Sequence, residues 1–143
     1  MDEPAPIVGT TRFIADVAPN APLFQLDLEK FSRDPAVVSA CQADPLVEQG
    51  GAPVHTAIEI VDAIGHLRDN ASRFTVPLLA LHGTADEITP PWGSREFVDL
   101  VASRDKTLIA YDGLVHDLVH EPERERVLGD IVSWLDRRVA KGP

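Results

Sequence analysis

The two halves of the chain differ in how apolar and polar residues are arranged. In the first half, helical spacing and helix-breaking residues predict short helices over residues 7–17, 35–43 and 56–69. The connections between them contain proline, glycine and asparagine, and no strong strand is indicated. We therefore expect this half to consist of helices and turns.

Two of these helices carry terminal signals. In the second helix, Asp34 occupies the N-cap position and Pro35 the first helical position. The Asp-Pro pair at residues 44–45 ends this helix. In the third helix, Thr56 and Glu59 fit a capping box, in which each side chain satisfies a backbone N–H of the first turn. These signals predict where both helices begin.

Short, continuous apolar runs characterise the second half. Residues 75–83 and 106–113 lack polar alternation, which is typical of strands buried on both faces. Amphipathic helices are predicted over residues 94–103 and 122–139, so strands and helices alternate as in an α/β unit with parallel strands. We expect the last helix to bury one apolar face, made of Val127, Leu128, Ile131, Val132 and Leu135.

An acid and a histidine follow the two predicted strands. Asp86 stands three residues after the first strand, in "LLALHGTADEITP", and His116 stands at the same point after the second, in "IAYDGLVHDL". Groups just beyond the carboxyl ends of parallel strands commonly form ligand and catalytic sites. An acid that accepts a hydrogen bond from one ring nitrogen fixes the histidine tautomer, so this pair is typical of two thirds of a catalytic triad.

Plainer interpretations stay open for each of these residues. An isolated Asp after a strand is commonly a turn residue that bonds its own backbone, and a lone loop histidine is commonly solvated. His82 lies at the end of the first strand, where a structural role is expected. The other histidines have no partnered spacing and are expected to be solvated: His55, His66 and His120. No cluster shows metal-ligand spacing, so neither a metal nor a cofactor is expected.

Charge and composition narrow the partners. The 143 residues include 13 basic and 23 acidic ones, which give a formal net charge of −10 and argue against nucleic acid as a partner. Cys41 is the single cysteine, so no internal disulfide can form and a reducing compartment is expected. The acidic N-terminus has no signal-peptide pattern and no apolar stretch approaches membrane-spanning length, so we expect a cytoplasmic protein.

The motifs "HGTAD", "GS", "DKTL", "Y-x-G-x-x-H" and "EPER" occur in order, preceded by "SRDPAVV" and "ADPLV". Together they resemble the monoacylglycerol lipase and lysophospholipase family of serine α/β-hydrolases. The resemblance implies a partial α/β-hydrolase fold, with a helical cap segment over residues 1–74 and the last two parallel strands and helices of the core over residues 75–143. It also implies that Asp86 is the triad acid and His116 the triad histidine. The family often has a second acid where Pro90 stands here.

The nucleophile that the resemblance calls for has no counterpart in the sequence. A nucleophile elbow requires Gly-x-Ser-x-Gly, and no serine here has glycine two residues to either side. The serines are Ser32, Ser39, Ser72, Ser94, Ser103 and Ser133. Cys41 fails the same test and is expected to be a small buried apolar residue. We therefore expect the chain alone to be inactive.

Several functions fit these observations. The first is the C-terminal half of a serine hydrolase that cleaves lipid-like esters such as monoacylglycerols or lysophospholipids. The second is the same half of a serine aminopeptidase or another esterase, and the third is a non-catalytic remnant or interaction module. The expected partners are a lipid-like ester, a separate N-terminal half, or another copy bound through an open strand edge.

Overall fold

A computed structural model of the protein describes residues 14, 17–47 and 50–139. Its contacts divide the chain into two compact units. One comprises the described parts of Met1–Leu26 and Asp44–Asn70, and the other those of Asp27–Ala43 and Ala71–Pro143. The helix predicted over residues 7–17 lies almost entirely outside the described residues.

The first unit contains two very short strands that the sequence analysis missed. Strand β1 (Pro22–Phe24) pairs antiparallel with β2 (Ala52–Pro53), and helix α3 (Val54–Asn70) follows directly. Strands of two or three residues are too short to show a periodic pattern.

Helix α3 begins two residues before the predicted capping box, so that prediction is wrong. The backbone N–H of Val54 donates to the carbonyl of Ala21 at 2.9 Å, and that of His55 donates to the carbonyl of Pro19 at 3.2 Å. Because backbone carbonyls already satisfy these two N–H groups, the helix can start at Val54 without the side-chain cap.

The second unit opens with the 3₁₀ turn η1 (Leu28–Lys30) and helix α2 (Pro35–Ala43). The predicted start of α2 is confirmed, because the Asp34 carboxylate accepts the backbone N–H of Ala36 at 2.9 Å. The turn η2 (Ala71–Arg73) then leads to the sheet.

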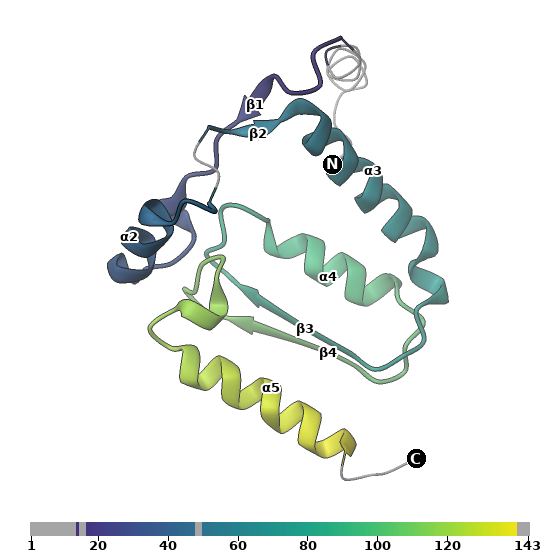
Figure 1. The fold of residues 1–143 in the computed structure, drawn as a ribbon. Coiled ribbons are helices and arrows are strands. Elements are labelled where there is room, and N and C mark those ends of the chain that lie inside the picture. The colour runs from purple at the N-terminus through teal and green to yellow at the C-terminus, as the bar shows by residue number, and fades with distance from the viewer. Residues whose placement is uncertain (1–13, 15–16, 48–49, 140–143) are drawn as a thin grey trace. The chain divides into compact units, whose positions relative to one another are not determined.

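A two-stranded parallel sheet forms the centre of this unit. Strand β3 (Leu78–Gly83) pairs with β4 (Lys106–Tyr111) in continuous register, from Leu78 beside Lys106 to Gly83 beside Tyr111. Helix α4 (Pro91–Leu100) connects the strands, and the turn η3 (Leu118–His120) and helix α5 (Arg124–Val139) follow. Figure 1 shows α4 and α5 on opposite sides of the sheet, which confirms the predicted α/β arrangement.

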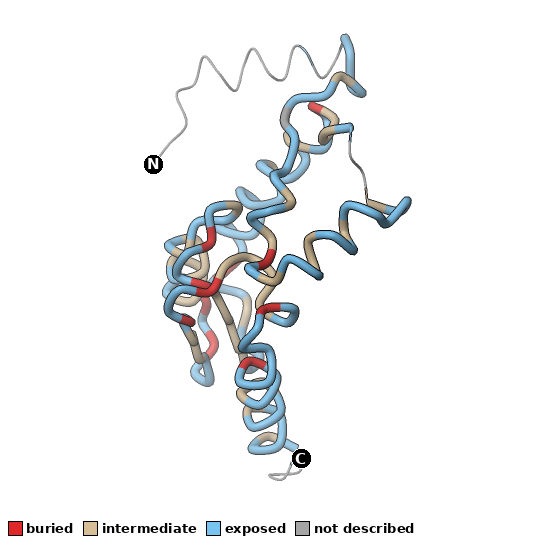
Figure 2. The backbone as a smooth tube through the Cα atoms, turned by 90° about the vertical axis from the view of Figure 1, so that its left-hand side faces the viewer, coloured by how far each residue is buried: buried red, intermediate tan, exposed pale blue. Residues whose placement is uncertain are grey.

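The core of the second unit lies between the sheet and α5. Tyr111, Leu114 and Val127 are buried there, with partly buried Leu81, Ile109, Leu118 and Ile131 packed around them. Figure 2 shows how few positions of the described chain are buried.

The predicted buried face of α5 is only partly correct. Val127 is fully buried, but Leu128, Val132 and Leu135 are 41%, 54% and 48% exposed. The helix presents the apolar stripe that its periodicity indicated, yet the described sheet has two strands and is too narrow to cover the whole stripe.

Candidate active site

The loops after β3 and β4 are held together by their own backbones. The N–H of Thr84 donates to the carbonyl of Tyr111 at 2.9 Å, and the N–H of Ala85 donates to the carbonyl of Leu114 at 3.0 Å. The Thr84 hydroxyl accepts the N–H of Gly113 at 2.9 Å, where Gly113 turns the chain with a φ of 72°. These bonds continue the hydrogen bonding between the two parallel strands beyond the ends of β3 and β4.

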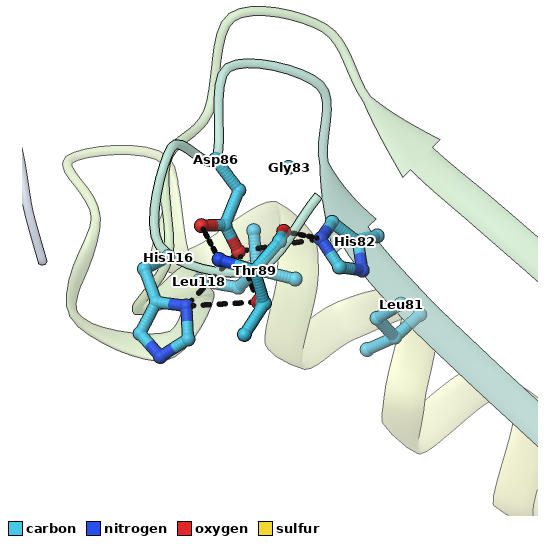
Figure 3. A pocket seen from close by; sticks show the side chains of 7 residues that line it. All are labelled: Leu81, His82, Gly83, Asp86, Thr89, His116 and Leu118. Atoms are coloured by element: carbon cyan, nitrogen blue, oxygen red, sulfur yellow. Dashed lines mark hydrogen bonds and ion pairs between the residues drawn. The ribbon is translucent and has the colours of Figure 1, made fainter. Parts of the chain in front are cut away.

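This arrangement brings Asp86 and His116 together. Nδ1 of His116 lies 2.9 Å from Oδ2 of Asp86, and the Thr89 hydroxyl lies 3.3 Å from the same nitrogen (Figure 3). An ionised carboxylate can only accept a hydrogen bond, so Nδ1 carries the proton and its N–H donates a hydrogen bond to Asp86. In the neutral ring, Nε2 then keeps a lone pair and can act as a base.

The Asp86 carboxylate is almost enclosed, with 3% of its side chain exposed. Its Oδ1 accepts the backbone N–H groups of Ile88 at 2.8 Å and Thr89 at 2.9 Å, and its Oδ2 accepts the Thr89 hydroxyl at 2.9 Å. Burial acts to raise the pKa of Asp86, but the hydrogen bonds from Thr89, His116 and Ile88 outweigh it and lower the pKa below its ordinary 3.8. The acid is therefore held as an anion at neutral pH.

His82 is a second imidazole on the same carboxylate. Its Nε2 lies 2.8 Å from the carbonyl oxygen of Thr89 and 3.2 Å from Oδ2 of Asp86, while its Nδ1 lies 2.6 Å from the hydroxyl of Ser94 in α4. Because Nε2 faces two acceptors, it carries the proton, and Ser94 donates to Nδ1. A structural role was expected for His82, but its contact with the acid had no sequence signal beyond its place at the strand end.

A pocket of about 230 Å³ opens beside this pair. Its lining residues are Leu81, His82, Gly83, Asp86, Thr89, His116 and Leu118 (Figure 3). Thr89 is the member that sequence analysis missed, because a single threonine in a loop has no pattern to distinguish it.

Two other histidines lie outside this pocket. His120 contacts Asp117 at 2.8 Å, and His55 lies 3.7 Å from Glu59 in α3. Among the described residues, no group of three or more His, Cys, Asp or Glu side chains is placed to hold a metal ion. No helix in the described part of the chain is long and apolar enough to cross a membrane.

Comparison with known proteins supports the resemblance found in the sequence. A family model described as "Serine aminopeptidase, S33" matches residues 3–123. The chain is 40% identical over 129 residues to a monoacylglycerol lipase of Mycolicibacterium smegmatis, covering 90% of this chain and 46% of that lipase. It is 34% identical over 126 residues to a monoglyceride lipase of Mus musculus, covering 87% of this chain and 42% of that protein.

A solved structure shows the same fold. The monoacylglycerol lipase of Paleococcus ferrophilus matches with a TM-score of 0.81 and 32% identity, over 93% of this chain and 52% of that one. The predicted partial α/β-hydrolase fold is therefore confirmed, and the chain spans about half the length of the proteins it matches.

Proposed function

Since the chain belongs to the family described as serine aminopeptidase, S33, we propose that it supplies the acid and the base of a serine ester hydrolase. The observation that carries this proposal is the 2.9 Å contact between Oδ2 of Asp86 and Nδ1 of His116, beside a pocket at the carboxyl ends of β3 and β4. The substrates we propose are lipid-like esters, because the relatives with 40% and 34% identity are lipases of monoacylglycerols by name.

In this mechanism, Nε2 of His116 takes the proton of a serine hydroxyl as that oxygen attacks the ester carbonyl. The imidazolium that forms is stabilised by the Asp86 anion through Nδ1–H. His116 then protonates the departing alcohol, which leaves an acyl-serine. In the second half of the reaction, His116 takes a proton from water as the water oxygen attacks the acyl carbonyl. His116 then returns that proton to the serine oxygen as its bond to the acyl carbon breaks, so the carboxylic acid leaves and the free serine is restored.

The serine and the oxyanion donors are proposed to come from sequence other than these 143 residues. None of the six serines lies in a Gly-x-Ser-x-Gly motif, and the tight turn of a nucleophile elbow requires both glycines. We accordingly propose that this chain has no esterase activity by itself. Residues 1–74 are proposed as the cap segment and residues 75–143 as the catalytic core segment.

The finer assignments are part of the same proposal. Lysophospholipids are alternative substrates, since they present a similar ester to the same acid and base. A cytoplasmic location is proposed from the single cysteine, Cys41, which is free.

A chimaera tests the function. In the lipase of Mycolicibacterium smegmatis, this chain replaces the 129-residue region that it matches. We expect the chimaera to hydrolyse a monoacylglycerol, and we expect Asp86→Asn or His116→Ala to lower kcat by about 10³-fold or more. His120→Ala is the matched control, because that exposed ring contacts Asp117 outside the pocket.

Two results would contradict the proposal. One is a folded chimaera whose activity survives His116→Ala. The other is ester hydrolysis by the unmodified 143-residue chain that is abolished by His116→Ala, because it would reveal a nucleophile within this sequence.

A further inference from the structure

A short segment 88 residues away in sequence lies against the loop that carries His116. This segment is Phe31–Arg33, between η1 and α2, and we call it the strap. The backbone N–H of Asp117 donates to the carbonyl of Phe31 at 2.7 Å, and the hydroxyl of Ser32 donates to the carbonyl of His120 at 3.1 Å. The strap thus binds the His116 loop at two points through backbone groups of that loop.

The third point is an ion pair. The side chain of Glu121 is fully buried, and its carboxylate accepts both the backbone N–H and the Nε–H of Arg33, at 2.7 Å and 2.6 Å. Its Oε2 lies 3.4 Å from the backbone nitrogen of Val115, the residue before His116. Arg33 also pairs with Glu123, so its guanidinium spans two acids.

A buried carboxylate needs partners that compensate for its lost hydration. The partners of Glu121 are the strap and the N–H of Val115, so this compensation also fixes the backbone on the N-terminal side of His116. The Asp117 bond to Phe31 fixes the backbone on the C-terminal side. His116 is consequently held between two anchored neighbours.

The strap also touches the imidazole itself. The ring of Phe31 meets the ring of His116 edge to face, with centroids 5.1 Å apart and an interplanar angle of 84°. This packing restricts rotation of the imidazole, while Asp86 and Thr89 bind its Nδ1 edge. Two independent constraints, on the backbone and on the ring, therefore converge on one side chain.

We propose that the strap and Glu121 are positioning residues, which hold the His116 imidazole in the orientation that directs Nδ1–H at Asp86. The orientation can be measured in this chain without any reaction. Its catalytic consequence rests on the proposed function, and the experiment keeps the two apart.

The direct test is NMR of the full 143-residue chain with ¹⁵N-labelled histidine. We expect the unmodified chain to show a Nδ1–H resonance for His116 that exchanges slowly with water. Phe31→Leu, which keeps the ion pair and an apolar side chain, should raise that exchange rate at least ten-fold, and so should Glu121→Gln. Lys30→Gln is the matched control, because Lys30 precedes the strap and pairs with Glu87 outside the His116 loop; it should change the rate less than two-fold.

A second control separates positioning from general loss of stability. Ile131→Ala weakens the packing of α5 in the core and should lower Tm while leaving the native exchange rate of Nδ1–H unchanged. The proposal is overturned if the unmodified chain lacks a slowly exchanging Nδ1–H, or if Phe31→Leu leaves the exchange rate of that proton unchanged. If Glu121→Gln does not fold, the Phe31→Leu result decides.

The chimaera supplies the catalytic readout. Phe31→Leu and Glu121→Gln should lower kcat at least ten-fold with KM changed less than two-fold, because they displace the base and leave the other residues that line the pocket in place. An inactive chimaera with the unmodified strap would count against the proposed function, whereas the NMR result would still stand. An active chimaera whose kcat is unchanged by both substitutions would overturn the positioning role.

Discussion

Gly83 lies against the backbone of Leu114 so closely that a β-carbon on Gly83 would come within 2.3 Å of the Leu114 carbonyl oxygen. The carbonyl oxygen of Val115 would be 2.4 Å away. Both are backbone atoms of the segment that leads to His116, so a flexible side chain cannot relieve the clash. Glycine at the end of β3 is therefore what allows the loop of the base to approach the loop of the acid.

Gly83→Ala is expected to separate Asp86 from His116. The β-carbon must displace residues 114–115, so the Nδ1–H resonance of His116 should be lost and the unfolding free energy should fall by about 2–4 kcal/mol. Gly129→Ala is the matched control, since a β-carbon there meets nothing within 4 Å and alanine is the better helix former in α5. The control should stabilise the chain by about 0.5–1 kcal/mol in a urea melt. A Gly83→Ala chain as stable as the control would contradict the crowding argument.

Tyr111 should make the protein sensitive to alkaline pH. Burial, together with its hydrogen bond to Asp130 at 2.9 Å, raises the pKa of Tyr111 from its ordinary 10.0 to about 12. The folded state therefore holds this proton more tightly than the unfolded state. Its contribution to stability is complete below pH 10 and is lost as the pH rises from 10 towards 12, by about 3 kcal/mol in total.

This titration can be followed without ambiguity, because Tyr111 is the single tyrosine of the chain. Tyrosinate absorbance should rise together with the loss of helical circular dichroism. In Tyr111→Phe, the part of the alkaline destabilisation due to this group should disappear. A tyrosine that ionises near pH 10 while the chain stays folded would show that the side chain is not buried as described.

The positions of Asp86 and His116 could be anticipated from sequence because parallel strands bring their carboxyl ends to the same edge. The unbroken apolar runs that became β3 and β4 were enough to place both residues there. The start of α2 was equally local, since it depends on Asp34 and on the residue after it. These are features that a few neighbouring residues decide.

Other features depend on contacts between residues that are far apart in the sequence and share no local pattern. Glu121 opens the motif "EPER" just before the predicted last helix, and its partner Arg33 is 88 residues away. The exposure of Val132 in α5 depends on the width of the sheet beneath the helix, which periodicity does not report. Tertiary pairing of this kind lies beyond what local sequence can predict.

Thr89→Val should raise the pKa of Asp86 while keeping the shape of the side chain at position 89. The hydroxyl that donates to Oδ2 of Asp86 at 2.9 Å is removed, while the backbone N–H of Thr89 still donates to Oδ1. That hydroxyl helps to lower the pKa of Asp86, so the pKa should rise in the variant and the unfolding free energy at pH 7 should fall by about 1–2 kcal/mol.

The sign of the pH effect follows from the lowered pKa of Asp86. The contribution of a carboxylate with a depressed pKa is complete above its ordinary value of 3.8 and is lost as the pH falls. In Thr89→Val the Asp86 carboxyl group should titrate at a higher pH, as followed by ¹³C NMR, and the loss of stability on acidification should be smaller. Thr107→Val in β4 is the control, and an Asp86 titration identical to that control would refute the role of the hydroxyl.

Lys106 should stabilise the end of α4. Its ammonium group donates to the carbonyl oxygens of Val98 at 2.7 Å, Asp99 at 3.4 Å and Val101 at 3.1 Å, where the helix has no further N–H groups to offer. Lys106→Met keeps the aliphatic stem and should lower the unfolding free energy by about 1–2 kcal/mol. Lys30→Met, which breaks only an exposed pair with Glu87, should leave the urea midpoint unchanged. Equal effects of the two substitutions would argue against the cap.

The 143-residue chain by itself is expected to self-associate along β3. Within the described residues β3 pairs with β4 alone, and its other edge leaves backbone donors and acceptors of an apolar strand without a neighbouring strand. Such an edge recruits a strand from another chain, either a second copy or the proposed N-terminal half. The net charge of −10 slows association but supplies no hydrogen bonds.

Light scattering after gel filtration should give a mass above the monomer value of 15.6 kDa that rises with concentration. Association could instead be caused by the exposed apolar face of α5. Val132→Lys tests this alternative, because a lysine there disrupts packing between copies of α5 and leaves the strand edge unchanged. We expect the Val132→Lys chain to associate like the unmodified one. Loss of association in that variant would assign the contact to α5, and a strictly monomeric chain with a sharp thermal transition would show that the edge of β3 is already closed.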